Sequence, residues 1–178
     1  MSYAAGLDTL LINAREIYTD MGHVIAVGLA EIESGVHHLP TLRRVADRQG
    51  AFLILAHPFR FLFDPHGIVT RNVLFTDPSR VPATPEEALS HPAFALVHEI
   101  EAVNGASNDR ENRFASEAAR LRGTPGTGGS DAHSHHGLAR GATFMQGDIR
   151  NERDLLDALR AGSYAPLERN REGNFFPV

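Results

Sequence analysis

Hydrophobic residues recur along the chain in short runs, and most runs lead through a polar cluster into a segment with helical spacing. The apolar runs predict strands at 9–13, 23–29, 51–56, 94–104, 124–131 and 142–145. Helical spacing of apolar residues predicts longer helices at 38–48, 109–122 and 152–160. Strands that alternate with helices predict an α/β fold with a parallel sheet or barrel.

Residues 59–94 break this alternation, and we interpret them as an irregular insertion and candidate lid. They contain one well-marked short helix, because Thr84 is a good N-cap and Pro85 is suited to a first helical turn. Further along, Gly123 is expected to end the second long helix and Asn151 to cap the third. The sequence therefore predicts where several helices begin and end.

Composition indicates one ordinary globular domain over residues 1–178. The chain is 42% hydrophobic and 22% charged, with a formal net charge of −5 that disfavours a broad nucleic-acid surface. All of its 17 basic residues are arginine, which excludes lysine Schiff-base chemistry. It has 0 cysteines, so any metal must be bound by imidazole, carboxylate, carbonyl or water.

The first twenty or so residues lack the pattern of a signal peptide, and the apolar run "AFLILA" (51–56) is too short to span a bilayer. We therefore expect a cytoplasmic protein with no membrane partner.

Polar side chains with metal-binding or acid–base chemistry follow several of the predicted strands. They are Glu16, His57, Glu101 or Asn104, and Asp131 with His133. In parallel α/β folds the functional residues gather at the carboxyl ends of the strands. A site built from these strand ends is therefore expected.

The segment "SDAH" (130–133) places the side chains of Asp131 and His133 two residues apart, on one side of an extended chain. The preceding Gly128 and Gly129 allow a close backbone approach. The alternative is a polar loop with incidental histidines. The adjacent histidines at 135 and 136 are expected to support the site or face solvent.

The segment "AHPFR" (56–60) puts His57 at the end of a buried strand, which Pro58 terminates. His57 is either a metal ligand or a core histidine bonded to a backbone carbonyl. Arg60 is either a contact for an anion such as phosphate or part of a surface ion pair.

In "EIEAVNG" (99–105), strict alternation would put Glu101 and Asn104 on opposite faces, and the sequence does not decide which face meets the site. His23 is interpreted as a structural or rim residue. The remaining histidines are interpreted as surface or loop residues: His37, His38, His66, His91 and His98.

No G-x-S-x-G nucleophile elbow, dinucleotide fingerprint or H-E-x-x-H pair occurs in the chain. A set of carboxylates and imidazoles without a nucleophile is typical of hydrolysis by metal-activated water.

Taken in order, "REIYTDMGHVIAVGL", "LAHPFR", "IEAVNG", "GGSDAHSHHG" and "NERDLLDALRAG" resemble the PHP (polymerase and histidinol phosphatase) family of metal-dependent phosphoesterases. The resemblance implies a distorted seven-stranded (βα)7 TIM-like barrel with two or three divalent ions (Zn, Mn or Fe). It implies that four residues bind these ions and act in catalysis: Glu16 as the bridging carboxylate, His57, Asp131 and His133. Arg60 would contact the substrate phosphate, and Asn104 lies near a position where some members have a further ligand.

The chain departs from the family at its start, where members carry a D-x-H-x-H strand that does not precede Glu16. The resemblance therefore implies a barrel that is incomplete at the N-terminus, either because the recorded start is too far downstream or because the gene is shortened. Since an open barrel exposes strand edges and core, we expect a homo-oligomer that covers the gap.

The leading functional hypothesis is a phosphoesterase that hydrolyses a small phosphorylated substrate, impaired by its missing ligands. The alternatives are a non-catalytic metal- or ligand-binding remnant of the fold and a related metal-dependent hydrolase of C–N bonds.

Overall fold

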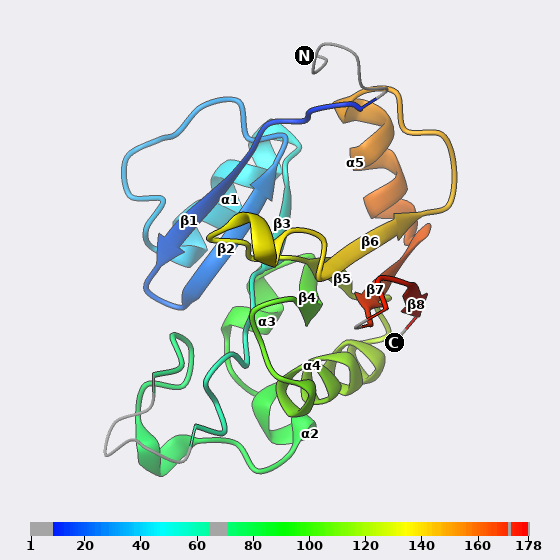
Figure 1. Ribbon diagram of the computed structural model, residues 1–178. Coiled ribbons are helices and arrows are strands. Elements are labelled where there is room, and N and C mark those ends of the chain that lie inside the picture. The colour runs from blue at the N-terminus through cyan, green and yellow to red at the C-terminus, as the bar shows by residue number, and fades with distance from the viewer. Residues whose placement is uncertain (1–8, 65–70, 171, 178) are drawn as a thin grey trace.

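The computed structural model describes residues 9–64, 71–170 and 172–177 (Figure 1). The strands are β1 (Ala14–Thr19), β2 (Gly22–Val27), β3 (Phe52–Leu55), β4 (Glu99–Asn104), β5 (Thr127–Gly129), β6 (Gly141–Met145), β7 (Tyr164–Arg169) and β8 (Phe175–Pro177). The α-helices are α1 (Leu39–Gln49), α2 (Pro85–Ala88), α3 (Ala93–Leu96), α4 (Asp109–Arg122) and α5 (Glu152–Ala161). Two short 3-10 helices cover Pro78–Arg80 and His135–Gly137.

The larger sheet has five strands in the order β1-β2-β3-β4-β5. Only β3, β4 and β5 run parallel, whereas β1, β2 and β3 pair antiparallel. The link between β1 and β2 consists of Asp20 and Met21, which is far too short for the crossover helix that parallel neighbours need. The expected all-parallel arrangement is therefore wrong for this half of the sheet.

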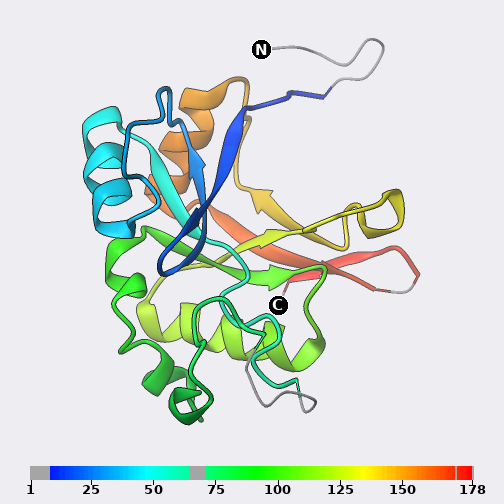
Figure 2. The ribbon, with the colours of Figure 1, turned by 90° about the vertical axis from the view of Figure 1, so that its left-hand side faces the viewer.

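The smaller sheet has three antiparallel strands in the order β6-β7-β8, and it lies beside β5 (Figure 2). Over the described residues the two sheets do not close into a barrel, so the predicted (βα)7 TIM-like barrel is wrong. The physical reason is that hairpins, which reverse the chain without a helix, join β1 to β2 and β7 to β8, and that β6 and β7 pair antiparallel although α5 lies between them in the chain. Neither β7 nor β8 was expected from the sequence.

Two apolar clusters cover the two faces of β3. The larger one packs Leu53 and Leu55 against α1, α3 and α4, and the smaller one packs Phe52 and Ile54 against α5 and Tyr164. All four residues of β3 are buried, as its unbroken apolar run predicts. The strand that ends at His57 is therefore held from both sides.

Helix boundaries agree closely with the sequence. Thr84 accepts a hydrogen bond from the Glu87 backbone N–H, Asn151 does the same for Asp154, and Gly123 ends α4 in the left-handed conformation. These caps satisfy backbone groups that a helix end leaves unpaired, which is why short polar residues and glycine mark the boundaries well.

Strand boundaries agree less well. In the expected strand 9–13 only Leu10 forms a bridge, and the strand begins at Ala14. The expected strand 94–104 begins at Glu99, because residues 93–96 form α3 instead. An apolar run of this length fits a buried helical turn as well as a strand.

The irregular segment 59–94 is described except for 65–70, which lie outside the described residues. Its described parts bury Phe59, Leu62 and Phe75 in the larger cluster. Much of this segment is therefore part of the core.

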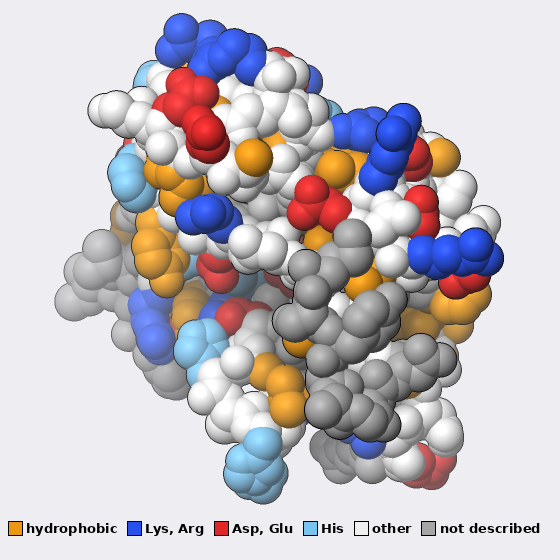
Figure 3. Space-filling model, turned by 90° about the horizontal axis from the view of Figure 1, so that it is seen from above, with side chains coloured by type: hydrophobic (Ala, Val, Ile, Leu, Met, Phe, Trp, Pro, Cys, Tyr) orange, Lys and Arg blue, Asp and Glu red, His pale blue; other side chains and the backbone are white. Residues whose placement is uncertain are grey.

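Among the described residues, no helix is long and apolar enough to cross a membrane. On the face shown in Figure 3, the arginine side chains lie in separate groups interspersed with acidic ones.

Candidate metal centre

The β1–β2 hairpin carries the first two polar groups of the site. Its register pairs Glu16 with Ile25 and Tyr18 with His23, so Glu16 and His23 lie diagonally on one face. The opposite face buries Ile17 and Val24 in the larger apolar cluster. The hydrophobic side of the hairpin therefore fixes which way Glu16 and His23 point.

His57 lies two residues after the end of β3 and is 7% exposed. Its backbone N–H donates to Glu101 Oε2 (2.8 Å), and its φ of 31° lies in the left-handed region. Such a conformation is unfavourable for a residue with a Cβ and is concentrated at functional sites. The His57 Nδ1 atom is buried without a hydrogen-bond partner among the described residues.

Glu16, His23 and His57 offer ligand atoms that all lie within 4.8 Å of one another. Glu16 Oε1 is 3.0 Å from His23 Nδ1 and 3.4 Å from His57 Nε2. Ligands about 2.1 Å from one zinc ion are about 3.0 Å apart at a right angle and about 3.4 Å apart at a tetrahedral angle. The donor types and their spacing therefore fit a divalent ion such as zinc, manganese or iron.

The charges around this group also favour a cation. The pKa of the Glu101 carboxyl is raised to about 7, mainly by burial; the hydrogen bonds from Asn104 and from the His57 backbone oppose this rise, and the charges of Asp131 and Glu16 add to it. Burial, together with His57, lowers the pKa of His23, so its imidazole stays unprotonated at neutral pH. The carboxyl groups of Glu16, Glu101 and Asp131 thus lie around two imidazoles, and a bound divalent cation would lower the repulsion among those that are ionised.

An irregularity in β4 brings Glu101 and Asn104 together. The register with β5 shifts between Glu101 and Val103, so that two steps along β4 match one step along β5. The Asn104 side-chain amide donates to Glu101 Oε2 (3.0 Å), although a regular strand would put these side chains on opposite faces. Strict alternation left open whether Glu101 or Asn104 faces the site. Because of the bulge, both residues do.

Asp131 lies beside this group on the loop after β5, in an ion pair between its Oδ2 and Arg60 Nη1. Its φ of 45° is again left-handed. Its charge acts on the pKa of both His23 and Glu101, which places it next to the strand-borne residues.

His133 is exposed and contacts Asp131. Its side chain is 79% exposed, and its Nδ1 lies 2.9 Å from the backbone oxygen of Asp131 and 3.6 Å from Asp131 Oδ1. The structure therefore brings Glu16 and His57 together and Asp131 beside them, while the role of His133 stays a prediction. His135 and His136 are exposed, and their rings lie 3.8 Å apart.

Gly129 makes room for Glu101. A Cβ atom at position 129 would overlap Glu101 Oε1, so only glycine allows the carboxylate its place against β5. This gives a structural reason for one of the two glycines that precede "SDAH".

Sequence reasoning missed His23 as a member of the group and left Glu101 undecided. A signal for His23 was present, because two alternating strands separated by "TDMG" predict a hairpin that puts residues 16 and 23 on one face. No comparable signal exists for Glu101, since a bulge cannot be read from one strand alone. Of the histidines assigned to surface or loop, His98 is half-buried against Phe52, and His66 lies outside the described residues.

Comparison with known protein families gives one match. The model of a family described as PHP-associated matches residues 109–164, about a third of the chain, from α4 to the first residue of β7. None of the curated proteins compared with the chain matches it. The matched segment contains Asp131 and His133 but not Glu16 or His57. It supports an association of this chain with the PHP family.

Proposed function

We propose that the chain is a metal-dependent phosphoesterase that hydrolyses a small phosphate ester. The observation that carries the proposal is the Glu16–His23–His57 group, in which one carboxylate oxygen lies 3.0 and 3.4 Å from two imidazole nitrogens. The PHP-associated match adds support, because that family is commonly composed of phosphoesterases.

Each residue of the site has a distinct task in this proposal. Glu16, His23 and His57 hold the ion, and Asp131 supplies a further carboxylate beside them. A bound divalent ion supplies Lewis acidity, which lowers the pKa of a water molecule and neutralises charge on the phosphate. Glu101 fixes His57 through its backbone N–H, and Asn104 in turn fixes Glu101.

In this proposal Arg60 binds the phosphate. Its Nη1 pairs with Asp131, while its Nε is buried without a partner among the described residues. A guanidinium carries five N–H donors, so the ion pair through Nη1 leaves others of Arg60 that could bind a phosphate.

Metal binding without catalysis is the second candidate. Two observations favour it: Asp131 is already paired with Arg60, and His133 is exposed. Glu16, His23 and His57 are then the three residues left to bind an ion. A site with few ligands and no second ion stabilises a phosphoryl transition state poorly.

Phosphate release separates the two candidates. The full chain is assayed with p-nitrophenyl phosphate and Mn²⁺, before and after chelation, alongside Glu16→Gln and the matched control Glu86→Gln on exposed α2. We expect hydrolysis that chelation abolishes, a loss of more than about 100-fold in kcat/KM for Glu16→Gln, and no change for Glu86→Gln. Bound Mn²⁺ without any hydrolysis would instead establish the non-catalytic candidate.

A further inference from the structure

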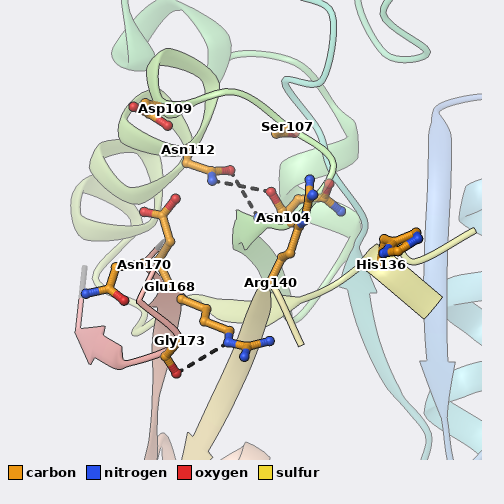
Figure 4. Close-up of a pocket in the computed structure, with 11 residues that line it drawn as sticks. Asn104, Ser107, Asp109, Asn112, His136, Arg140, Glu168, Asn170 and Gly173 are labelled. Carbon is orange, nitrogen blue, oxygen red and sulfur yellow. Dashed lines mark hydrogen bonds between the residues drawn. The ribbon is translucent and has the colours of Figure 1, made fainter. Parts of the chain in front are cut away.

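A polar cavity lies next to the candidate metal centre and shares Asn104 with it. It has a volume of about 500 Å³ and opens between the start of α4, the loop before β6 and the end of β7 (Figure 4). In that view Asp109 and Asn112 come from the helix side, and Glu168 and Asn170 from the strand side. The cavity is large enough for the organic part of a small phosphate ester.

Two asparagine side chains of the cavity wall are held by hydrogen bonds to the backbone. Asn112 Oδ1 accepts a hydrogen bond from the Asn104 backbone N–H (3.0 Å), and the Asn112 side-chain amide donates to the Asn104 backbone oxygen (3.3 Å). Asn170 Oδ1 accepts from the backbone N–H groups of Glu172 and Asn174. These amides are held in place before any ligand arrives, which lowers the entropic cost of binding.

Several other lining side chains have no partner among the described residues. Glu168 is half-buried and Asp109 exposed, and both carboxylates are free to accept hydrogen bonds. Arg140 and the Ser107 hydroxyl, also on the lining, are free to donate. A ligand here meets acceptors and donors side by side, and a hydroxyl group, which both donates and accepts, satisfies both.

The charges of the cavity argue against a second phosphate. The two carboxylates of Asp109 and Glu168 balance the guanidinium groups of Arg140 and Arg169. The start of α4 offers no anion site either, because Asn108 and Glu111 already form a capping box on its first N–H groups. The described lining contains no Phe, Tyr or Trp, and the imidazole of His136 is its one aromatic ring, so the cavity is mainly polar.

We propose that this cavity binds a neutral, hydroxyl-rich group, such as a sugar or polyol, as the alcohol part of the phosphate ester. The proposal rests on the proposed function for its reaction, with the phosphate at Arg60 and the metal centre. The hydrogen bonds from Asn104 to Glu101 and from His57 to Glu101 join the two sites along one wall.

Ribose 5-phosphate and p-nitrophenyl phosphate test the subsite, because they share a phosphate but only the first carries hydroxyl groups. Glu168→Gln and Asp109→Asn each keep the side-chain shape and remove a charged acceptor, and Glu86→Gln is the control. We expect KM for ribose 5-phosphate to rise about tenfold in either cavity variant, with p-nitrophenyl phosphate unchanged. An equal change for both esters, or no change for either, would overturn the proposal.

Binding gives a readout that does not need hydrolysis. In a ¹H–¹⁵N spectrum, ribose 5-phosphate should shift the side-chain amide signals of Asn112 and Asn170 in the full chain, and Glu168→Gln should reduce the shift. Shifts without phosphate release would contradict the proposed phosphoesterase and keep the subsite. Phosphate release without shifts would support the proposed phosphoesterase and contradict the proposed subsite.

Discussion

Two parts of the candidate site differ in how they are supported. Glu16 and His23 lie on paired strands whose other face is buried in the core, and His57 lies two residues after the buried β3, whereas Asp131 and His133 lie on a loop. The exposed fraction of the His57 side chain is 7%, against 79% for His133. The difference teaches that a sequence motif such as "SDAH" does not by itself give preorganised ligands. Glu16, His23 and His57 are better positioned than His133 to bind an ion.

The largest expected effect contrasts one histidine from each part. His57→Asn should weaken Zn²⁺ binding by more than about 100-fold, because it removes an ion ligand held by the core. His133→Asn, the matched change on the loop, should weaken it by less than about tenfold. Competition with a zinc indicator measures both, and circular dichroism checks that the variants fold.

Equal losses in the two variants would break the comparison. They would mean that the loop closes over the ion and that His133 moves from its exposed position to become a ligand.

A smaller effect, on the free energy of unfolding, is expected at Gly129, which packs against Glu101 just before the loop that carries Asp131. Gly129→Ala should lower the free energy of unfolding by about 2–3 kcal/mol, because its Cβ would overlap Glu101. Gly123→Ala should cost only about 1 kcal/mol, since it has open space and only an unfavourable φ of 73°. Urea denaturation measures both values.

Zinc affinity then sharpens this result. It should fall in Gly129→Ala, where Glu101 and His57 are displaced, and stay unchanged in Gly123→Ala. Unchanged affinity in Gly129→Ala would show that Glu101 does not position His57.

The smallest expected effect is the change in folding stability at low pH, which arises at His98, away from the proposed ligands. Burial, followed by the charge of Arg43, lowers the pKa of His98, and His98 Nδ1 accepts from the Leu53 backbone N–H (2.9 Å). The folded chain therefore binds fewer protons at this residue than the unfolded chain does. Its contribution to stability is complete above about pH 6.5 and is lost as the pH falls toward the lowered pKa.

His98→Gln keeps an oxygen that can accept this hydrogen bond and removes the titration. The free energy of unfolding, measured by urea denaturation between pH 7.5 and 5.5, should change less in His98→Gln than in the natural chain. An unchanged pH dependence would contradict the assignment. A decrease in metal affinity at low pH can then be distinguished from a decrease in the stability of the fold at low pH.

Much of the local structure could be predicted from the sequence. The α1 face with Leu39 and Leu42, the caps at Thr84 and Asn151, and the buried strand before His57 all follow from local chemistry. The architecture could not, because strand direction depends on which segments pair across the chain. The short link between β1 and β2 was the available sign against a parallel barrel.

The site was predictable only in part. Glu16 and His57 were found because each follows an apolar run, and the structure places them 3.4 Å apart. His23 required the hairpin register, and Glu101 required the bulge in β4. The exposure of His133 depends on the loop conformation around Asp131, which no periodicity encodes.

The hydrogen bonds that run from Asn104 through Glu101 to His57 have a thermodynamic consequence. They connect the polar cavity to the proposed ion ligands, and a ligand in the cavity and a cation at the proposed centre would form a closed cycle of equilibria. Whatever factor a bound cation applies to the affinity for a sugar, the sugar must apply to the affinity for the cation. Titrating either ligand in the presence of the other therefore measures the same coupling free energy.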